Sequence, residues 1–373
     1  MFGGRPLSDF DMAGPLNGPV RMAGCRSHEV ATLEGACQAA PPAPHPHLPE
    51  DPDMTASTTR RTTARARIAA VGAIAVAGTL LLTACGDQTD SASQESGSGK
   101  ETKSGAPLFS KLPEKYQKSG VIKVGTNAEY APMESVENGK IVGVDPDLAE
   151  ALGKQLGVKF EFTSGSFDGL ITALNSGRHD IAMSSITDNK QRQEGLDDAG
   201  KKLGPGVDFV DYFLAGTAVY TKKGNPQNIN SIEDLCGKRA AVQRGTTYEE
   251  ALKKQSKACT DGGEKAITIE PFENDTEAQT RVKSGGAVAG VNDYPVAVDL
   301  ARKADGGNAF EVVGEQVDAG PFGIAVKKGN TGLRDALKEA VDAIIADGSY
   351  QKVLDKWGAG TGAIDKAAIN GGK

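Results

Sequence analysis

Hydrophobic and polar positions follow one repeating order twice along this chain, over residues 121–185 and again over residues 239–293. Short apolar runs with strand-like alternation are separated by stretches in which apolar residues recur every three or four positions, as on one face of a helix. The clearest such face, in residues 143–157, consists of Leu148, Leu152 and Leu156. Strands and helices that alternate in this way form parallel sheets with right-handed connections, so each unit predicts one α/β lobe.

The first unit predicts three strands and two helices, and the second unit repeats this arrangement with one further helix after its last strand. Strands of the first unit are expected at residues 121–125, 158–162 and 180–185, with helices at 143–157 and from Phe167. Strands of the second unit are expected at residues 239–243, 266–272 and 287–293, with helices from Thr247, Asp275 and Pro295. Two final helices, at residues 333–346 and 349–357, are expected to return to the first lobe.

Two extended stretches, residues 211–225 and 320–330, are long enough to cross between the two units. Two lobes joined by two crossing segments leave a cleft, and small-molecule sites favour such interfaces and the carboxyl ends of parallel strands. The predicted boundaries are 107–216 with 322–360 for one lobe, 217–321 for the other, hinges near Gly216 and Gly323, and a flexible tail at 361–373.

The N-terminal part of the chain has the pattern of a secretion signal. Residues 1–53 show no sustained periodicity and are rich in proline towards their end, so we interpret them as a disordered upstream extension. Residues 54–84 begin with arginines and no acid, then continue through about 15 apolar or small residues, fewer than the roughly 20 that a membrane span needs. We therefore expect a signal peptide that starts at Met54.

Cys85 ends this apolar run, and the sequence Leu82-Thr83-Ala84-Cys85 resembles a bacterial lipobox. In such a signal the cysteine thiol receives a diacylglycerol and becomes the mature N-terminus, and two acyl chains hold a protein stably at a membrane. The alternative is a buried cysteine at the end of a core helix, which the polar residues that follow disfavour. We expect residues 85–106, rich in serine and glycine, to be a flexible tether on the outer face of the cytoplasmic membrane.

The net charge, the histidines and the cysteines indicate which ligands and covalent bonds are expected. With 373 residues, a formal net charge of -7 and no basic stripe, the chain is not expected to bind nucleic acid. His45 and His47 lie in a proline-rich segment and are interpreted as solvated rather than as metal ligands, and no cofactor is expected. If Cys85 carries lipid, Cys236 and Cys259 remain in the folded part, which predicts a disulfide, with two free thiols as the alternative.

Residues 111–358 resemble family 3 of the solute-binding proteins of bacterial ABC importers, which take polar amino acids. The resemblance rests on the order of five motifs, GTNAEYAPME, GVDPDLAEALGKQLG, DGLITALNSGRHDIAMSSIT, QRGTTYEEAL and DGSYQKVLDKWG. It implies a type II periplasmic-binding-protein-like fold, an amino acid ligand in the cleft, a transporter permease as partner, and a monomer. Pro146, Val288 and the longer loop at residues 197–206 depart from the family pattern, and the role of that loop stays open.

An α-amino acid needs donors for its carboxylate, and Arg192 is the first candidate. A guanidinium binds a carboxylate through two parallel hydrogen bonds, and in the resembled family an arginine at this position binds the substrate carboxylate. A solvated helix arginine is the alternative. Helix N-terminal amides near Thr187, and those of Gly245-Thr246-Thr247, would add donors, with simple N-capping by Thr246 as the other interpretation.

The ligand ammonium needs acceptors, and three residues at the ends of predicted strands are candidates. Ser184 and Ser185 end one strand and Asp293 ends another. The resemblance implies that both positions contact the ammonium. The alternatives are turn or cap formation for the two serines, and capping of the helix from Pro295 for Asp293.

The ligand side chain needs walls. Tyr130 and Phe167 are expected to line its pocket, with core packing as the alternative for Phe167. Relatives that take cationic amino acids often carry an acid at the position of Asn127, so this neutral amide disfavours a strict arginine or lysine binder unless Glu129 supplies the charge. The expected ligand is therefore a polar amino acid of unspecified side chain.

Two other functions stay open at this point. Some dehydratases resemble this family, which leaves an enzyme on the same fold, and a sensory or adhesion lipoprotein is the other possibility. The pair of Arg192 and Asp293 favours binding of an unchanged amino acid. Only His179 lies in the expected folded part, and no Ser-His-Asp arrangement is visible, so we do not expect an enzyme.

Overall fold

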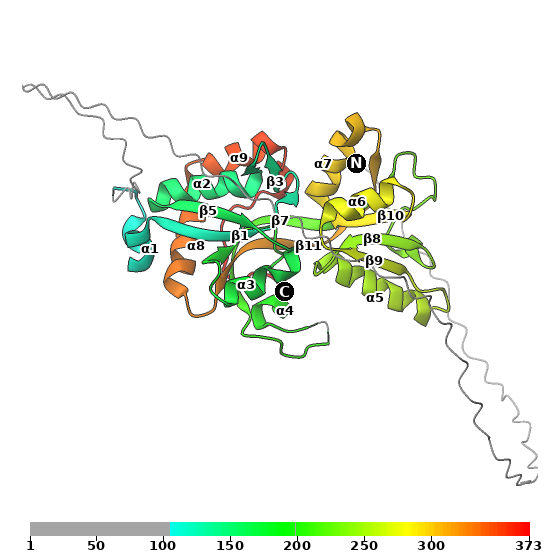
Figure 1. Ribbon diagram of the computed structural model, residues 1–373, viewed down its shortest axis with the longest axis horizontal. Helices are drawn as coiled ribbons and strands as arrows, with labels where there is room; N and C mark the ends of the chain where they lie inside the picture. Colours follow the sequence, from blue (N-terminus) through cyan, green and yellow to red (C-terminus); the bar gives the residue numbers. More distant parts are fainter. Residues whose placement is uncertain (1–104, 198) are drawn as a thin grey trace, which may run out of the picture. The chain divides into compact units, whose positions relative to one another are not determined.

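The computed structural model describes residues 105–197 and 199–373, and Figure 1 shows how their helices and strands are arranged. The expectations for residues 1–53, for the signal segment 54–84, for lipid at Cys85 and for most of the tether lie outside the described residues. Within the described part of the chain, no helix is both long and apolar enough to cross a membrane.

The first lobe is built on three parallel strands in the order β5-β1-β6. They are β1 (Val121–Thr126), β5 (Lys159–Ser164) and β6 (Ile181–Ala182). The helices of this lobe are α1 (Glu114–Ser119), α2 (Val144–Leu156), α3 (Leu170–Asn175), α4 (Lys190–Glu194), α8 (Thr331–Ala346) and α9 (Ser349–Trp357). A small antiparallel sheet consists of β2 (Glu129–Tyr130), β3 (Glu134–Glu137) and β4 (Lys140–Val142).

Helix α2 shows how the leucine spacing determines packing. Leu148, Leu152 and Leu156 are all buried, and they join a core that also contains residues of α8 and α9. The helix ends at Gly157, which adopts the left-handed conformation with φ 70° that glycine accepts without steric cost. The predicted helix over residues 143–157 is thereby confirmed.

Strand β6 is shorter than the predicted strand at residues 180–185, because only Ile181 and Ala182 remain extended in the sheet. Ser185 has a left-handed backbone with φ 49°, which a strand does not accommodate. The backbone therefore leaves the sheet just before Ser185, and this departure determines where its side chain lies.

The second lobe repeats the arrangement with parallel strands in the order β10-β8-β9. They are β8 (Arg239–Gln243), β9 (Thr268–Phe272) and β10 (Ala289–Asp293), with helices α5 (Thr247–Asp261), α6 (Asp275–Lys283) and α7 (Tyr294–Lys303). Cys236, just before β8, forms a disulfide with Cys259 on α5, with a Cα–Cα distance of 5.6 Å. The predicted disulfide is confirmed.

Two long strands, β7 (Val207–Lys222) and β11 (Phe310–Lys327), run through both lobes and pair antiparallel with each other. In the described part of the chain they join both sets of parallel strands into one eight-stranded sheet. The two lobes and the two crossing segments are as predicted, whereas the pattern of alternation does not reveal that the crossing segments are themselves strands. They occupy the free edges of β6 and β10, whose backbone groups would otherwise lack partners.

The crossing strands are irregular where they pass between the lobes. Their pairing shifts register between Val313 and Val317, between Val317 and Gly320, and again between Phe322 and Gly323. The amide of Gly216 there donates to the side chain of Gln316 at 3.0 Å. Hinges near Gly216 and Gly323 remain a prediction, placed where the ladder is weakest.

Residues 361–373 differ from the expected flexible tail. Ala367 and Gly372 are buried, and Ile369 forms an antiparallel bridge with Val210 of β7. The composition of this segment, rich in glycine and alanine, is typical of a mobile tail, but its small residues here permit a close approach to β7. The expectation of a flexible tail is therefore corrected.

Candidate functional site

Arg192 lies at the carboxyl end of the strands of the first lobe, on the short helix α4. Asn189 caps this helix by accepting a hydrogen bond of 2.9 Å from the backbone amide of Arg192. The guanidinium donates to the carbonyl of Thr187 at 2.7 Å and, across to the second lobe, to the carbonyl of Gly245 at 3.1 Å. Burial lowers the pKa of Arg192, and Glu250 and Asp293 oppose that change.

The guanidinium of Arg192 also lies over an aromatic ring, with its Cζ atom 5.6 Å from the ring centroid of Phe167. A cation over a ring face is attracted by the ring quadrupole, so this contact holds the guanidinium plane in place. Arg192 is therefore not a solvated helix residue, because both lobes and a ring fix its side chain.

Asp293 ends β10 on the second lobe and is 5% exposed. Its carboxylate accepts a hydrogen bond of 2.5 Å from the hydroxyl of Tyr130 on the first lobe. Burial raises the pKa of Asp293 to about 7, although the hydrogen bond from Tyr130 and the charge of Arg192 lower it. Within residues 105–197 and 199–373 its side chain makes no capping bond to α7, so the interpretation of Asp293 as a helix cap does not hold.

One interlobe cavity brings most of the predicted side chains together. It measures about 10 Å³ and is lined by Tyr130, Phe167, Ser185, Thr187, Arg192, Gln243, Thr246, Thr247, Tyr248 and Asp293. A cavity of about 360 Å³ shares Thr187, Thr247 and Asp293 with it. A larger groove of about 700 Å³ lies between α2 and β5, away from these residues, and is lined by apolar residues and glycines together with lysines and acids.

Sequence reasoning missed two of these lining residues, Gln243 and Tyr248. Gln243 is the last residue of β8, at the carboxyl end of a parallel strand, and this position was a usable signal. Tyr248 is buried in the first turn of α5, and its hydroxyl donates to that of Tyr130 at 3.3 Å. Its place in the motif QRGTTYEEAL gives no sign of this contact, which forms only when the lobes meet.

The two serines differ in role. Ser184 donates to the carboxyl group of Glu134 at 2.6 Å and accepts from the amide of Asn127 at 2.9 Å, so its hydroxyl is engaged within the first lobe. The hydroxyl of Ser185 is buried and finds no hydrogen-bond partner among the described residues. Ser185 therefore offers a free polar group at the cavity, whereas Ser184 supports the backbone beside it.

A pair of buried acids lies behind these serines. Glu134 and Asp145 are both fully buried, and Asp145 accepts hydrogen bonds from the hydroxyl of Tyr212 at 2.7 Å and from the amide of Ser185 at 3.2 Å. Burial raises the pKa of Glu134 well above its usual range and that of Asp145 to about 7. Asp145 thus holds the left-handed backbone of Ser185, a role that its sequence context does not reveal.

Neutral amides close one end of the interlobe contact. The side chain of Asn127, on the first lobe, donates a hydrogen bond to Asn274 at 3.2 Å and accepts one from Gln243 at 3.0 Å. Both partners belong to the second lobe. Glu129 is exposed and accepts from Thr276 at 2.6 Å, and it does not line the interlobe cavity. The carboxylate of Glu129 therefore does not supply a charge to this cavity, which was the role considered for it from the sequence.

Thr246 and Thr247 begin α5 from the second lobe. The hydroxyl of Thr246 accepts from the amide of Glu249 at 3.1 Å and donates to the carbonyl of Gln243 at 2.8 Å, so it caps the helix as the alternative interpretation had it. The hydroxyls of Thr247 and Thr187 are 3.4 Å apart across the lobes. Thr247 therefore contributes its side chain to the cavity, while Thr246 mainly orients the helix end.

Two lobes on shared crossing strands, with an arginine and an aspartate facing one interlobe cavity, define the class of solute-binding proteins. Residues 122–360 match bacterial extracellular solute-binding proteins, family 3, and the chain belongs to this family. It is 32% identical to the arginine-binding protein ArgT of Corynebacterium glutamicum over 263 residues, covering 69% of this chain and 81% of that protein. It is 27% identical to the L-cystine-binding protein TcyJ of Escherichia coli, covering 66% and 85%.

Solved structures give the same result. An ancestral arginine-binding protein bound to glutamine is 38% identical, with a TM-score of 0.56 over 64% of this chain and 98% of that one. The fold predicted from the order of strands and helices is therefore confirmed as that of the family.

Proposed function

We propose that this protein captures a polar α-amino acid between its lobes and delivers it to an ABC importer. The observation that carries the proposal is the placement of Arg192 and Asp293, one from each lobe, on one cavity. An α-amino acid carries the complementary pair of charges on adjacent atoms. A ligand that bridges the two would stabilise the closed arrangement of the lobes.

The polar groups around this pair have matching roles. The Arg192 guanidinium binds the ligand carboxylate in place of its present carbonyl partners, and the amides at the start of α5 add donors. Asp293 accepts from the ammonium, and the free hydroxyl of Ser185 contributes a further acceptor. Phe167 and Tyr130 line the pocket for the ligand side chain.

We further propose that the preferred side chain is polar and uncharged. The amide of Gln243 lines the cavity and donates to Asn127, which lies outside the lining, at 3.0 Å, and Glu129 is exposed and bonded to Thr276. Amides offer both donors and acceptors, which suits an amide or hydroxyl side chain better than a buried cation. Relatives named for arginine and for cystine, and the ancestral protein bound to glutamine, indicate how wide the range of ligands in this family is.

The location completes the proposal. We infer that Cys85 carries the lipid that holds the protein at the outer face of the cytoplasmic membrane, where an importer receives its ligand. We further infer that the protein acts as a monomer. Mass spectrometry of the mature N-terminus tests the anchor, and an unmodified Cys85 within a longer chain would refute it.

A thermal-shift screen of the amino acids tests the ligand class. Binding stabilises the folded state by RT ln(1 + [L]/Kd), about 2.7 kcal/mol at a hundredfold excess over Kd. We expect glutamine or another uncharged polar amino acid to give the largest shift. Turnover of an added amino acid would instead favour an enzyme on this fold.

A further inference from the structure

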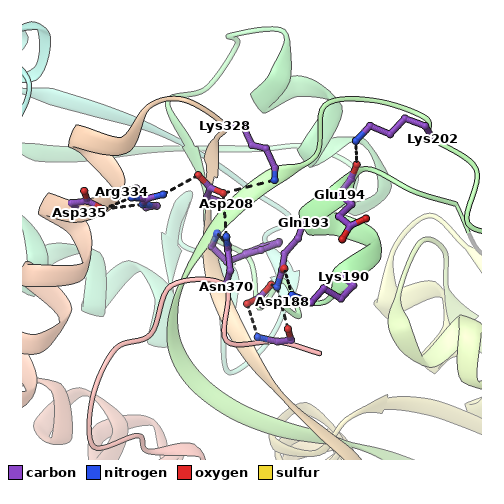
Figure 2. A network of polar contacts seen from close by, with 12 residues as sticks. Asp188, Lys190, Gln193, Glu194, Lys202, Asp208, Lys328, Arg334, Asp335 and Asn370 are labelled. Carbon is purple, nitrogen blue, oxygen red and sulfur yellow. Dashed lines mark hydrogen bonds and ion pairs between the residues drawn. The ribbon is translucent and has the colours of Figure 1, made fainter.

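Residues 367–373, here called the strap, lie along the first part of β7. The backbone of the strap bonds to β7 through the carbonyl of Ala368 and the amide of Asn370, at 2.9 and 3.2 Å. Asn370 adds side-chain bonds of 2.7 Å from the amide of Phe209 and 3.2 Å to the carboxylate of Asp208. Figure 2 shows Asn370 beside Asp208, which also pairs with Arg334.

The next two residues of the strap contact two buried acids. The amide of Gly371 donates to Asp211 at 3.1 Å, and that of Gly372 donates to Asp188 at 2.8 Å. Burial and the nearby charge of Asp188 raise the pKa of Asp211 to about 7. Backbone amides that donate to two adjacent carboxyl groups offset their mutual repulsion. The strap therefore reduces the electrostatic cost of burying Asp188 and Asp211 close together.

The approach is so close that only glycine fits. A Cβ atom on Gly372 would lie 2.0 Å from the carbonyl oxygen of Asp188, and one on Gly371 would lie 2.5 Å from the carboxylate of Asp211. Both distances are far below van der Waals contact, and the atom that Gly372 meets is backbone, which cannot move aside cheaply. The pair Gly371-Gly372 is therefore a specific fit rather than a featureless tail.

The contacts of the strap continue into the helix that carries Arg192. Asp188 also accepts from the side chain of Gln193 of α4 at 2.7 Å, and Gln193 donates to the carbonyl of Gly372 at 3.2 Å. The backbone amide of Lys190 donates to the backbone oxygen of Lys373 at 3.3 Å. Figure 2 shows Asp188, Gln193 and Lys190 grouped at this point. The strap thus holds α4 through Lys190 and Gln193.

Asp188 lies between two residues that contact Arg192 directly. Thr187 accepts from its guanidinium and Asn189 accepts from its backbone amide. Residues 371–373 also line the cavity of about 360 Å³ together with Thr187, Thr247 and Asp293. The strap therefore reaches the ligand site both through α4 and as part of the neighbouring cavity wall.

We propose that the strap is a positioning element of the amino acid site, which holds Asp188 and the start of α4 so that Arg192 faces the ligand carboxylate. The proposal rests on the proposed function. It assigns a role in ligand affinity to Gly371, Gly372 and Asp188, which contact Arg192 only through other groups.

Calorimetric titration of the full chain with its best amino acid, beside two variants, tests this role. One variant ends after Asn370, and the other is Gly372→Ala. The matched control is Gly360→Ala, since a Cβ there would meet its nearest atoms at 3.7 and 3.8 Å, ordinary contact distances. The melting temperature of each protein without ligand shows whether it is folded.

We expect both strap variants to bind about tenfold more weakly, the equivalent of one or two hydrogen bonds lost at the site. Their melting temperatures should fall below that of the control, because the bonds to Asp188 and Asp211 are lost or weakened, while the bonds of residues 367–370 to β7 keep the protein folded. A strap with a purely structural role would lower the melting temperature and leave the affinity of the folded protein unchanged.

Two outcomes separate this proposal from the proposed function. If the full chain binds an amino acid and both variants bind it within about twofold of the control, the strap does not position the site. If the full chain itself binds no amino acid, the proposed function fails first.

Discussion

The hydroxyl of Tyr130 donates a hydrogen bond of 2.5 Å to the carboxylate of Asp293, joining the first lobe to the second at the wall of the interlobe cavity. The same hydroxyl lies 2.5 Å from the side-chain oxygen of Asn292. In this arrangement of the lobes, the hydrogen bond orients the carboxylate that we propose as the acceptor for the ligand ammonium. The protonation state of Asp293 should therefore affect ligand affinity.

Ligand affinity should depend on pH through Asp293. Its pKa in the described structure is about 7, raised by burial, and only the carboxylate pairs with an ammonium group. Affinity should therefore fall as the pH decreases below about 7, by at most about tenfold per pH unit. At pH 7 binding should release about half a proton, which calorimetry in buffers of different ionisation heat measures.

The variant Asp293→Asn is the control for this effect. It should bind weakly and without this proton release, since the titrating carboxyl group of Asp293 is replaced by an amide. An unchanged proton release in the variant would assign the titration to another group, and a constant affinity of the natural protein between about pH 5 and 8 would contradict the role of Asp293.

Tyr130→Phe should shift the pH dependence of ligand affinity to higher pH. The hydrogen bond from Tyr130 lowers the pKa of Asp293, so its removal raises that pKa further. Affinity near pH 7 should fall several-fold and recover in part at higher pH. Tyr248→Phe is the matched control, because its hydroxyl contacts Tyr130 rather than Asp293. Equal shifts in both variants would show that the hydrogen bond is not responsible.

The buried acids Glu134 and Asp145 should make stability decrease with rising pH. Burial raises the pKa of Glu134 well above its usual range, so this group favours folding most below its unfolded pKa and loses that contribution as the pH rises through its folded pKa. Glu134→Gln resembles the protonated acid, keeps an acceptor for Ser184, and should flatten the loss of melting temperature as the pH rises above the unfolded pKa of Glu134.

Glu134→Ala gives the contrasting result. It leaves the hydroxyl of Ser184 without its acceptor and should cost about 1–3 kcal/mol in the free energy of unfolding where Glu134 is protonated, and less as the pH rises and the natural protein loses the contribution of Glu134. Denaturant unfolding across the pH range measures both variants. If Glu134→Gln retains the full loss of stability with rising pH, the titrating group is not Glu134.

The disulfide should support stability and leave ligand affinity unchanged. Cys236 and Cys259 are 23 residues apart and lie outside the interlobe cavity. Replacing both with serine should lower the free energy of unfolding by about 3 kcal/mol in the chain-entropy model. Reductant should destabilise the natural protein by a similar amount and have no effect on the double variant. A large loss of affinity in the double variant would connect the disulfide to the site.

The lobes were predictable from the sequence because the period of apolar residues directly reports which face of a helix or strand is buried. The leucines of α2 and the glycine that ends it show this most clearly. Arg192 and Asp293 were predictable as candidate site residues because they carry the charges that complement an amino acid and, for Arg192 above all, because of the family resemblance. Their meeting on one cavity follows from the parallel arrangement of the strands.

The remaining features depend on contacts that are distant in sequence. The apolar pattern of β7 and β11 does not say which free edges they will pair with, and Gln243 and Tyr248 reach the cavity only when the lobes meet. Residues 361–373 have the composition of a mobile tail, yet Gly371 and Gly372 fit closely against two buried acids. Composition reports average behaviour, whereas these contacts depend on individual atoms.

Isothermal titration calorimetry of the full chain with glutamine and the other polar amino acids is the most direct measurement, carried out beside Arg192→Ala and the exposed control Arg178→Ala. We expect one amino acid to bind at a single site in the natural protein and in Arg178→Ala. In Arg192→Ala its affinity should fall by at least about a hundredfold, because the buried bidentate partner of the carboxylate is lost. Binding that survives unchanged in Arg192→Ala, or no binding of any amino acid to the natural protein, would contradict an interlobe amino acid site.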